Sequence, residues 1–120
     1  MAKVLIVDDS KTSRKFLRNM LEGAGHEIVA EAVDGAEGVE KYLELKPDVV
    51  TMDITMPIMD GIEAVTKIMT LDREAKVIMV TAAGQKNNMV EALKKGAADF
   101  IQKPFESGII LNTIDKVLEE

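Results

Sequence analysis

The sequence has 120 residues, the length of a single domain, and 47% of them are hydrophobic, which is enough for a buried core. The 21 acidic residues outnumber the 15 basic ones and give a net charge of -6. A direct nucleic-acid partner is therefore not expected, because phosphate binding needs a basic surface. No cysteine occurs, which excludes a disulfide scaffold, a thiolate metal site and a cysteine nucleophile.

The N-terminal segment resembles neither a targeting signal nor a membrane span. Met1-Ala2-Lys3 leads into four apolar residues, Val4 to Val7, and then into two aspartates. This apolar stretch is too short for a signal peptide or a transmembrane helix. We therefore expect a cytoplasmic protein that has no contact with membranes and is complete as given.

Apolar runs and helical spacings alternate along the chain. Continuous runs rich in β-branched residues are typical of parallel strands that are covered by helices on both faces. Such runs predict strands, in chain order, at 4–7, 28–30, 49–52, 77–80 and, more weakly, 100–101. Apolar residues at helical spacing predict helices around 16–24, 39–43, 62–69, 89–93 and 110–118.

Two Asp-Gly dipeptides, Asp34-Gly35 and Asp60-Gly61, could be hairpin turns, because this pair is a strong type I′ signal. Each is followed by a helical pattern, so we interpret both as loops that lead into helices. Strand and helix then alternate five times. This order predicts an α/β domain with three layers, α/β/α, around a five-stranded parallel sheet with right-handed crossovers.

Polar residues follow the predicted strands at the points where the strands end. Asp8 and Asp9 follow the first run, Asp53 the third, Thr81 the fourth and Lys103 the fifth. In an open parallel sheet, ligands bind outside the carboxyl ends of the strands, so these side chains should converge. Each one alone has an ordinary explanation, such as a helix N-cap or a turn. Their shared position at one end of the strands favours a site.

The chemistry of this group points to phosphoryl transfer. Three crowded carboxylates need compensating positive charge, and Lys103 supplies only one unit. Oxygen ligands without His or Cys suit Mg²⁺. A divalent metal, an ammonium and the Thr81 hydroxyl together can hold a phosphoryl group, and an aspartate can be the nucleophile that accepts it.

These residues resemble the receiver domain of two-component response regulators, and within that family the single-domain chemotaxis regulators of the CheY type. The resemblance covers the whole chain. It rests on Val4-Leu5-Ile6-Val7-Asp8-Asp9-Ser10, Pro47-Asp48, Met52-Asp53-Ile54-Thr55-Met56-Pro57, Asp60-Gly61, Thr81-Ala82 and Lys103-Pro104-Phe105. It implies one receiver domain over residues 1–120 and a flavodoxin-like fold with strand order 2-1-3-4-5.

The resemblance also implies a role for each residue at the strand ends. Asp53 accepts a phosphoryl group from a phosphohistidine, and Lys103 pairs with the phosphoryl oxygens. Asp9 and Asp53 bind Mg²⁺ directly, the backbone carbonyl of Thr55 adds an oxygen, and Asp8 acts largely through water.

A conformational switch is implied as well. Thr81 moves to hydrogen-bond the phosphoryl group, and the vacated space lets Phe100 turn inward. Many family members carry Tyr at this position, so the inward state of Phe100 must be stabilised by packing alone.

The function implied is that of a stand-alone signalling protein and not an enzyme, phosphorylated on Asp53 by a sensor histidine kinase of the chemotaxis type. The expected partners are that kinase, a phosphatase and the flagellar motor switch protein, and the chain is expected to be a monomer. One alternative is a phosphorelay intermediate that passes its phosphoryl group to a histidine phosphotransfer protein. Another is a phosphatase of the haloacid dehalogenase type, which needs a second Asp two residues after its nucleophile and finds none after Asp8 or Asp53.

The sequence pattern alone suggests an interpretation of two further features. Lys11, Arg14, Lys15 and Arg18 share one face of the first predicted helix, which is either a solvated face or a docking strip for an acidic partner. His26 is the only histidine, and we expect it at the surface because it follows a helix that ends at glycine.

Overall fold

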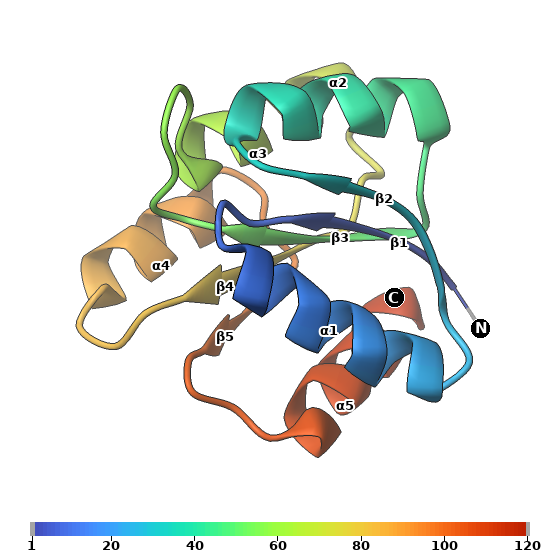
Figure 1. Cartoon of the computed structure of the whole chain (residues 1–120). Helices are drawn as coiled ribbons and strands as arrows, with labels where there is room; N and C mark the ends of the chain where they lie inside the picture. Colours follow the sequence, from blue (N-terminus) through green and yellow to red (C-terminus); the bar gives the residue numbers. More distant parts are fainter. Residues whose placement is uncertain (1, 120) are drawn as a thin grey trace.

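The computed structural model describes residues 2–119 and shows strands and helices alternating along the chain (Figure 1). The strands are β1 (Lys3–Val7), β2 (Glu27–Ala32), β3 (Val49–Asp53), β4 (Val77–Thr81) and β5 (Asp99–Gln102). The helices are α1 (Lys11–Gly23), α2 (Gly35–Leu45), α3 (Gly61–Leu71), α4 (Lys86–Lys94) and α5 (Ser107–Leu118).

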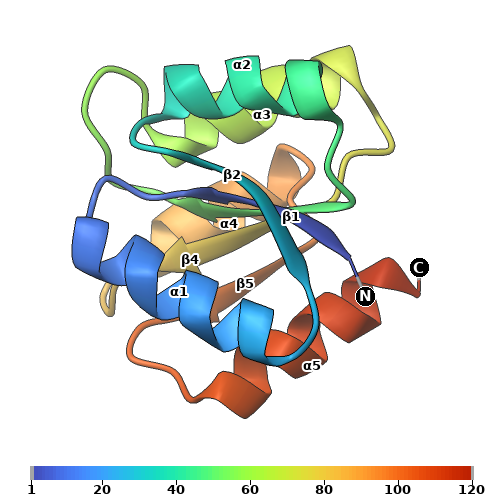
Figure 2. The same ribbon diagram turned by 45° about the vertical axis from the view of Figure 1, so that its right-hand side comes forward.

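The strands form one parallel sheet in the order β2-β1-β3-β4-β5, which confirms the predicted fold. Helices α1 and α5 lie on one face of the sheet, and α2 and α3 lie on the other (Figures 1 and 2). Ala92 of α4 belongs to the same core cluster as α2 and α3, so α4 completes that layer.

The central strands β1, β3 and β4 are largely apolar because each face of the sheet has its own core. In β1, Leu5 and Val7 pack in the cluster beneath α2, α3 and α4. Val4 and Ile6 pack in the cluster beneath α1 and α5. Successive side chains of a strand point to opposite faces, so a strand buried on both faces needs a continuous apolar run.

Both Asp-Gly dipeptides are helix starts, as interpreted from the sequence. Asp34 caps α2 by accepting a hydrogen bond from Glu37 N–H at 2.8 Å, and Asp60 caps α3 in the same way from Glu63 N–H at 2.8 Å. The glycine that follows Asp60 also has a steric role, because a Cβ at Gly61 would overlap the backbone carbonyl of Asp53. The start of α3 is thereby packed directly against the end of β3.

The surface position expected for His26 is wrong, because the side chain is buried. Its Nδ1 accepts a hydrogen bond from Ala2 N–H at 3.0 Å, and Glu27 N–H donates to the Ala2 carbonyl at 2.8 Å. The chain turns back after α1 and enters β2 beside the start of β1, so this residue is enclosed by a segment 24 positions away. Spacing along the chain carries no signal for that contact.

Strand β2 is longer than predicted. The apolar run suggested residues 28–30, whereas the strand extends over Glu27–Ala32 and includes the charged Glu31. An edge strand has only one neighbour in the sheet, which leaves room for a charged side chain that finds partners on a helix.

None of the helices in the described part of the chain is long and apolar enough to cross a membrane.

Candidate functional site

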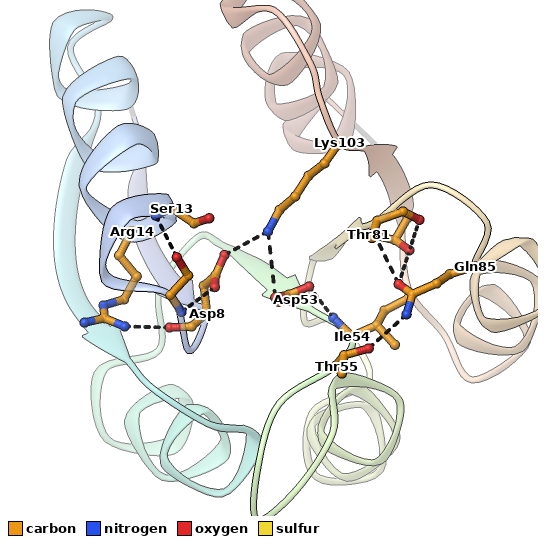
Figure 3. Close-up of polar contacts among 11 residues, drawn as sticks. Asp8, Ser13, Arg14, Asp53, Ile54, Thr55, Thr81, Gln85 and Lys103 are labelled. Carbon is orange, nitrogen blue, oxygen red and sulfur yellow. Dashed lines mark hydrogen bonds and ion pairs between the residues drawn. The ribbon is translucent and has the colours of Figure 1, made fainter.

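The predicted site residues come from the ends of different strands, or from the loops that follow them, at one edge of the sheet (Figure 3). Asp8 and Asp9 follow β1, Asp53 is the last residue of β3 and Thr81 is the last residue of β4. Lys103 follows β5. Because β3 lies between β1 and β4, the parallel order of the sheet brings their carboxyl ends together.

Asp8, Asp9 and Asp53 form an acidic pocket. One carboxylate oxygen from each lies within 4.8 Å of the other two. Asp8 is only 1% exposed, Asp53 is partly buried and Asp9 is exposed to solvent. Oxygen ligands at this spacing, with no nitrogen or sulfur, are the set that Mg²⁺ prefers. The acidic pocket can therefore hold a hard divalent cation.

Lys103 directs its charge into the acidic pocket. Its Nζ lies 3.3 Å from Asp8 Oδ2 and 3.8 Å from Asp53 Oδ2. Its backbone N–H donates to the Thr81 carbonyl at 2.7 Å, and its peptide bond to Pro104 is cis. The backbone of Lys103 is thus attached to β4 while its ammonium faces the carboxylates of β1 and β3.

The charge balance around Asp53 supports the fit to a divalent cation. Burial raises the pKa of Asp53 to about 6; the Lys103 ammonium opposes the rise, and the Asp8 and Asp9 carboxylates add to it. The backbone N–H of Ile54, which donates to Asp53 Oδ1 at 2.9 Å, also favours the ionised form. One ammonium does not balance three carboxylates, and a divalent cation would supply the missing positive charge.

The loop that carries Asp8 is fixed on several sides. The Asp8 N–H donates to the Ala32 carbonyl of β2 at 3.0 Å, and Ser10 N–H donates to Asp8 Oδ1 at 2.8 Å. Arg14 Nη1 donates to the Asp8 carbonyl at 2.8 Å. Ser10 also caps α1 by accepting from Ser13 N–H at 3.2 Å. The first acidic residue of the pocket is therefore held by both β2 and α1.

Arg14 and Arg18 are bound to β2 and are not part of a free basic strip. Both reach Glu31, with Nε–Oε distances of 3.0 Å for Arg14 and 2.6 Å for Arg18. Burial acts to raise the pKa of Glu31, but the hydrogen bonds from Arg18 and Arg14 outweigh it and hold the pKa below its ordinary value. Lys11 and Lys15 are exposed, as a solvated face requires. Sequence reasoning missed this cluster because Glu31 lies 17 and 13 residues from its two partners.

Thr81 is fully buried, and its hydroxyl is directed at a residue that the sequence did not single out. Thr81 Oγ1 donates to Gln85 Oε1 at 2.8 Å, and Gln85 Nε2 donates to Thr55 Oγ1 at 2.9 Å (Figure 3). No motif marks Gln85, which is the residue that precedes α4. Thr55, the predicted carbonyl ligand of the metal, follows Asp53 by two positions and is exposed.

Phe100 lies on the edge strand β5 and is 37% exposed. In the sheet it is paired with Met79 of β4, two residues before Thr81. The structure shows this residue partly at the surface, and its predicted inward turn stays a prediction.

The family of the chain follows from comparison with known proteins. The sequence profile of the response regulator receiver domain matches residues 4–115. The chain belongs to this family. Chemotaxis protein CheY of Listeria monocytogenes is 52% identical over 116 residues, which cover 97% of this chain and 98% of the relative. Chemotaxis protein CheY of Thermotoga maritima is 50% identical over 115 residues, which cover 96% of both chains.

A solved structure agrees with this assignment. A chain in the crystal structure of the CheX-CheY-BeF3-Mg²⁺ complex from Borrelia burgdorferi is 42% identical and superposes with a TM-score of 0.92, covering 96% of this chain and 87% of that chain. The predicted CheY-like receiver fold is confirmed. Receiver domains are signalling modules that bind Mg²⁺ at an acidic pocket, and this chain has an aspartate cluster that could bind a metal ion.

Proposed function

We propose that this chain is a phosphorylation-activated chemotaxis regulator and that Asp53 is its phosphoryl acceptor. The observation that carries the proposal is the position of the Asp53 carboxylate, which lies in the acidic pocket and 3.8 Å from the Lys103 ammonium. About half of the residues are shared, over nearly the full length, with chemotaxis proteins CheY. In this proposal the output is binding to another protein, so the chain is not an enzyme.

The proposed transfer uses a phosphohistidine of a sensor histidine kinase as donor. A carboxylate oxygen of Asp53 attacks the phosphorus, an O–P bond forms, and the N–P bond to the imidazole breaks. The imidazole nitrogen keeps the bonding electron pair, and the product is an acyl phosphate on Asp53. Lys103 then pairs with the phosphoryl oxygens and stabilises the negative charge that they carry.

The metal would be held by residues at the ends of β1 and β3. Asp9 and Asp53 would bind Mg²⁺ directly, the Thr55 carbonyl would add one oxygen, and Asp8 would act through water. When bound, the ion supplies positive charge beside the phosphoryl group that is transferred. Arg14 holds the Asp8 carbonyl at 2.8 Å and so keeps the first carboxylates of the pocket in place before the donor arrives.

Thr81 and Phe100 would convert the charge on Asp53 into a change of surface. The Thr81 hydroxyl would turn from its present partners to a phosphoryl oxygen, and Phe100 would move into the space that is vacated. Phe100 has no hydroxyl, so packing alone would stabilise its inward position. Phosphorylation would then alter the surface around β5.

Two surfaces support protein partners. An apolar groove lies beside Lys103 and is lined in part by Phe16, Ala83, Pro104 and Phe105, which suits docking of the kinase and of a phosphatase near Asp53. Strand β5 and helices α4 and α5 expose apolar side chains that would bind the flagellar motor switch protein, namely Val90, Leu93, Phe100 and Ile109.

The test of the proposal is incorporation of phosphate from acetyl phosphate in the presence of Mg²⁺. We expect labelling of the wild-type chain, no labelling of Asp53→Asn, and no labelling of the wild type when EDTA removes the metal. Equal labelling of the wild type and Asp53→Asn would overturn the assignment of Asp53.

A second measurement separates the chemotaxis role from the phosphorelay alternative. The phosphorylated chain is mixed with a flagellar motor switch protein or with a histidine phosphotransfer protein. Phosphorylation-dependent binding to the first supports the proposal. Transfer of the label to the histidine phosphotransfer protein, without binding to the motor switch protein, would contradict the proposal and indicate a relay function.

A further inference from the structure

Gln85 occupies the N-cap position of α4 but does not cap the helix. The side chains of Ser10, Asp34 and Asp60 cap α1, α2 and α3, whereas the Gln85 amide forms its hydrogen bonds away from α4. Glutamine is not a preferred N-cap residue, so helix stability does not explain its presence here. Its contacts point to another role.

The Gln85 amide joins two loops at the edge of the site (Figure 3). Its Oε1 accepts from Thr81 Oγ1 at 2.8 Å and from Ala82 N–H at 3.2 Å. Its Nε2 donates to Thr55 Oγ1 at 2.9 Å. One side chain thus connects the end of β4, which carries the predicted switch hydroxyl, with the loop after β3, which follows the phosphoryl acceptor.

The orientation of the amide follows from the chemistry of its partners. A backbone N–H can only donate, so the atom that faces Ala82 N–H must be the amide oxygen. The same oxygen then faces the Thr81 hydroxyl, which must donate to it. The amide nitrogen faces Thr55 Oγ1, which accepts. Each polar atom of Gln85 is therefore matched with a partner of the opposite kind.

This arrangement commits the only proton of the Thr81 hydroxyl. The hydroxyl has one hydrogen to donate, and two acceptors lie within its reach: Gln85 Oε1 at 2.8 Å, which is the nearer, and the Ala82 carbonyl at 3.2 Å. The oxygens of an ionised phosphoryl group are acceptors, so Thr81 can bind one of them only by donating that same hydrogen. Gln85 and a phosphoryl group on Asp53 therefore compete for one proton.

We propose that Gln85 is a positioning residue that holds Thr81 in its resting orientation and so opposes the switch. The proposal rests on the proposed function, because it assumes that Thr81 binds the phosphoryl group. Phosphorylation at Asp53 has to draw the Thr81 hydroxyl away from Gln85. Removing the Gln85 amide makes the active arrangement easier to reach, and removing its anchor on Thr55 does so to a smaller extent.

The experiment measures the affinity of the chain for beryllofluoride, a mimic of the phosphoryl group, in saturating Mg²⁺ by amide NMR titration. Gln85→Met keeps an unbranched side chain of similar length and removes the hydrogen bonds. We expect it to tighten the apparent Kd by about 2- to 10-fold, the range that corresponds to one net hydrogen bond. Asn87→Met is the matched control, because Asn87 is exposed in the first turn of the same helix, and its Kd should equal that of the wild type.

Two further variants separate the proposed positioning role of Gln85 from a merely structural role. Thr55→Val removes the hydroxyl that anchors Gln85 Nε2 and keeps the backbone carbonyl, so we expect a smaller gain in affinity. In a Thr81→Ala background, Gln85→Met should have no effect beyond that of the control. Structural damage would weaken the binding of beryllofluoride. Loss of the contact by which Gln85 holds Thr81 would strengthen that binding.

Each outcome bears on one proposal. If Gln85→Met binds beryllofluoride as the wild type does, or more weakly, the positioning role of Gln85 is overturned. The proposed function then still stands, provided that the wild type binds beryllofluoride normally. A gain that persists in full in the Thr81→Ala background also overturns the positioning role. If the wild type binds no beryllofluoride and takes no label on Asp53, the proposed function fails instead.

Discussion

The two sides of the acidic pocket are built from different kinds of interaction. On the β1 side, defined by residues 8–10 with Arg14 and Glu31, a backbone hydrogen bond to β2 and a charged hydrogen bond from Arg14 hold the chain. On the β4 side, defined by Thr81, Ala82 and Gln85 with Thr55, the Thr81 carbonyl accepts a backbone hydrogen bond from Lys103 N–H. The side-chain contacts there are neutral hydrogen bonds of the Gln85 amide, and Thr55 and Ala82 are exposed.

This difference separates what must stay in place from what must move. Hydrogen bonds to charged groups contribute about 1.5–3 kcal/mol, whereas neutral ones contribute about 0.5–1.5 kcal/mol. Helix α1 on the β1 side has a side-chain cap, but α4 on the β4 side and α5 beyond β5 begin without one. Asp8 and Asp9 thus lie on the side with the stronger contacts, and the proposed switch residue Thr81 lies on the side whose side-chain contacts are more easily exchanged.

The largest effect on stability is expected when the contacts of Arg14 on the β1 side are removed. Its side chain is 15% exposed, and Arg14→Met would leave both the Asp8 carbonyl and Glu31 without this partner. We expect a loss of about 2 kcal/mol in the free energy of unfolding, measured by urea denaturation, together with weaker Mg²⁺ binding by calorimetry. Lys15→Met, on the exposed face of the same helix, is the control and should change neither quantity.

A wild-type-like stability of Arg14→Met would show that the β1 side is not held by this residue. Loss of stability with unchanged Mg²⁺ affinity would show that Arg14 supports the fold and not the pocket.

A smaller effect is expected from titrating Glu31. Its pKa is below the ordinary value, so its ion pairs stabilise the folded state fully above about pH 4.3, and this contribution is lost as the pH falls through the folded-state pKa. The stability difference between wild type and Glu31→Gln should therefore shrink from about pH 6 to about pH 3.5. A constant difference over this range, measured by urea denaturation at each pH, would show that the charge of Glu31 contributes nothing.

The smallest effect on stability is expected at Thr51, which lies on the central strand β3. Its hydroxyl is the one buried side-chain polar atom without a hydrogen-bond partner among the described residues, and the residue is 1% exposed. Thr51→Val replaces the hydroxyl by a methyl of similar size, so we expect a gain of about 1 kcal/mol and a higher Tm. Beryllofluoride binding should stay unchanged, and a lower Tm would show that the hydroxyl is satisfied in solution.

The sequence predicted the parts of the molecule that depend on local pattern. Continuous apolar runs predicted the strands, and the rule that ligands bind at the carboxyl ends of parallel strands predicted that Asp8, Asp53 and Lys103 lie together. The strand order came from the family resemblance, because periodicity alone does not say which strands are neighbours.

The features that were missed depend on contacts between distant segments. His26 is buried by the start of β1, and Glu31 is ion-paired with α1 although nothing near it in the sequence indicates a partner. Gln85 reaches Thr55 across 30 residues, and a glutamine before a helix carries no sequence signal for that contact. Side-chain partners of this kind become visible only when the loops are placed in space.

The most direct test of the account compares amide NMR spectra of the Mg²⁺-saturated chain with and without beryllofluoride. We predict large shifts at residues 81–85 and 99–103, small shifts at residues 10–14, and no shifts beyond those of Mg²⁺ alone in Asp53→Asn. Equal shifts on both sides of the acidic pocket, or the same shifts in Asp53→Asn, would contradict the claim that charge on Asp53 moves the β4 side against a fixed β1 side.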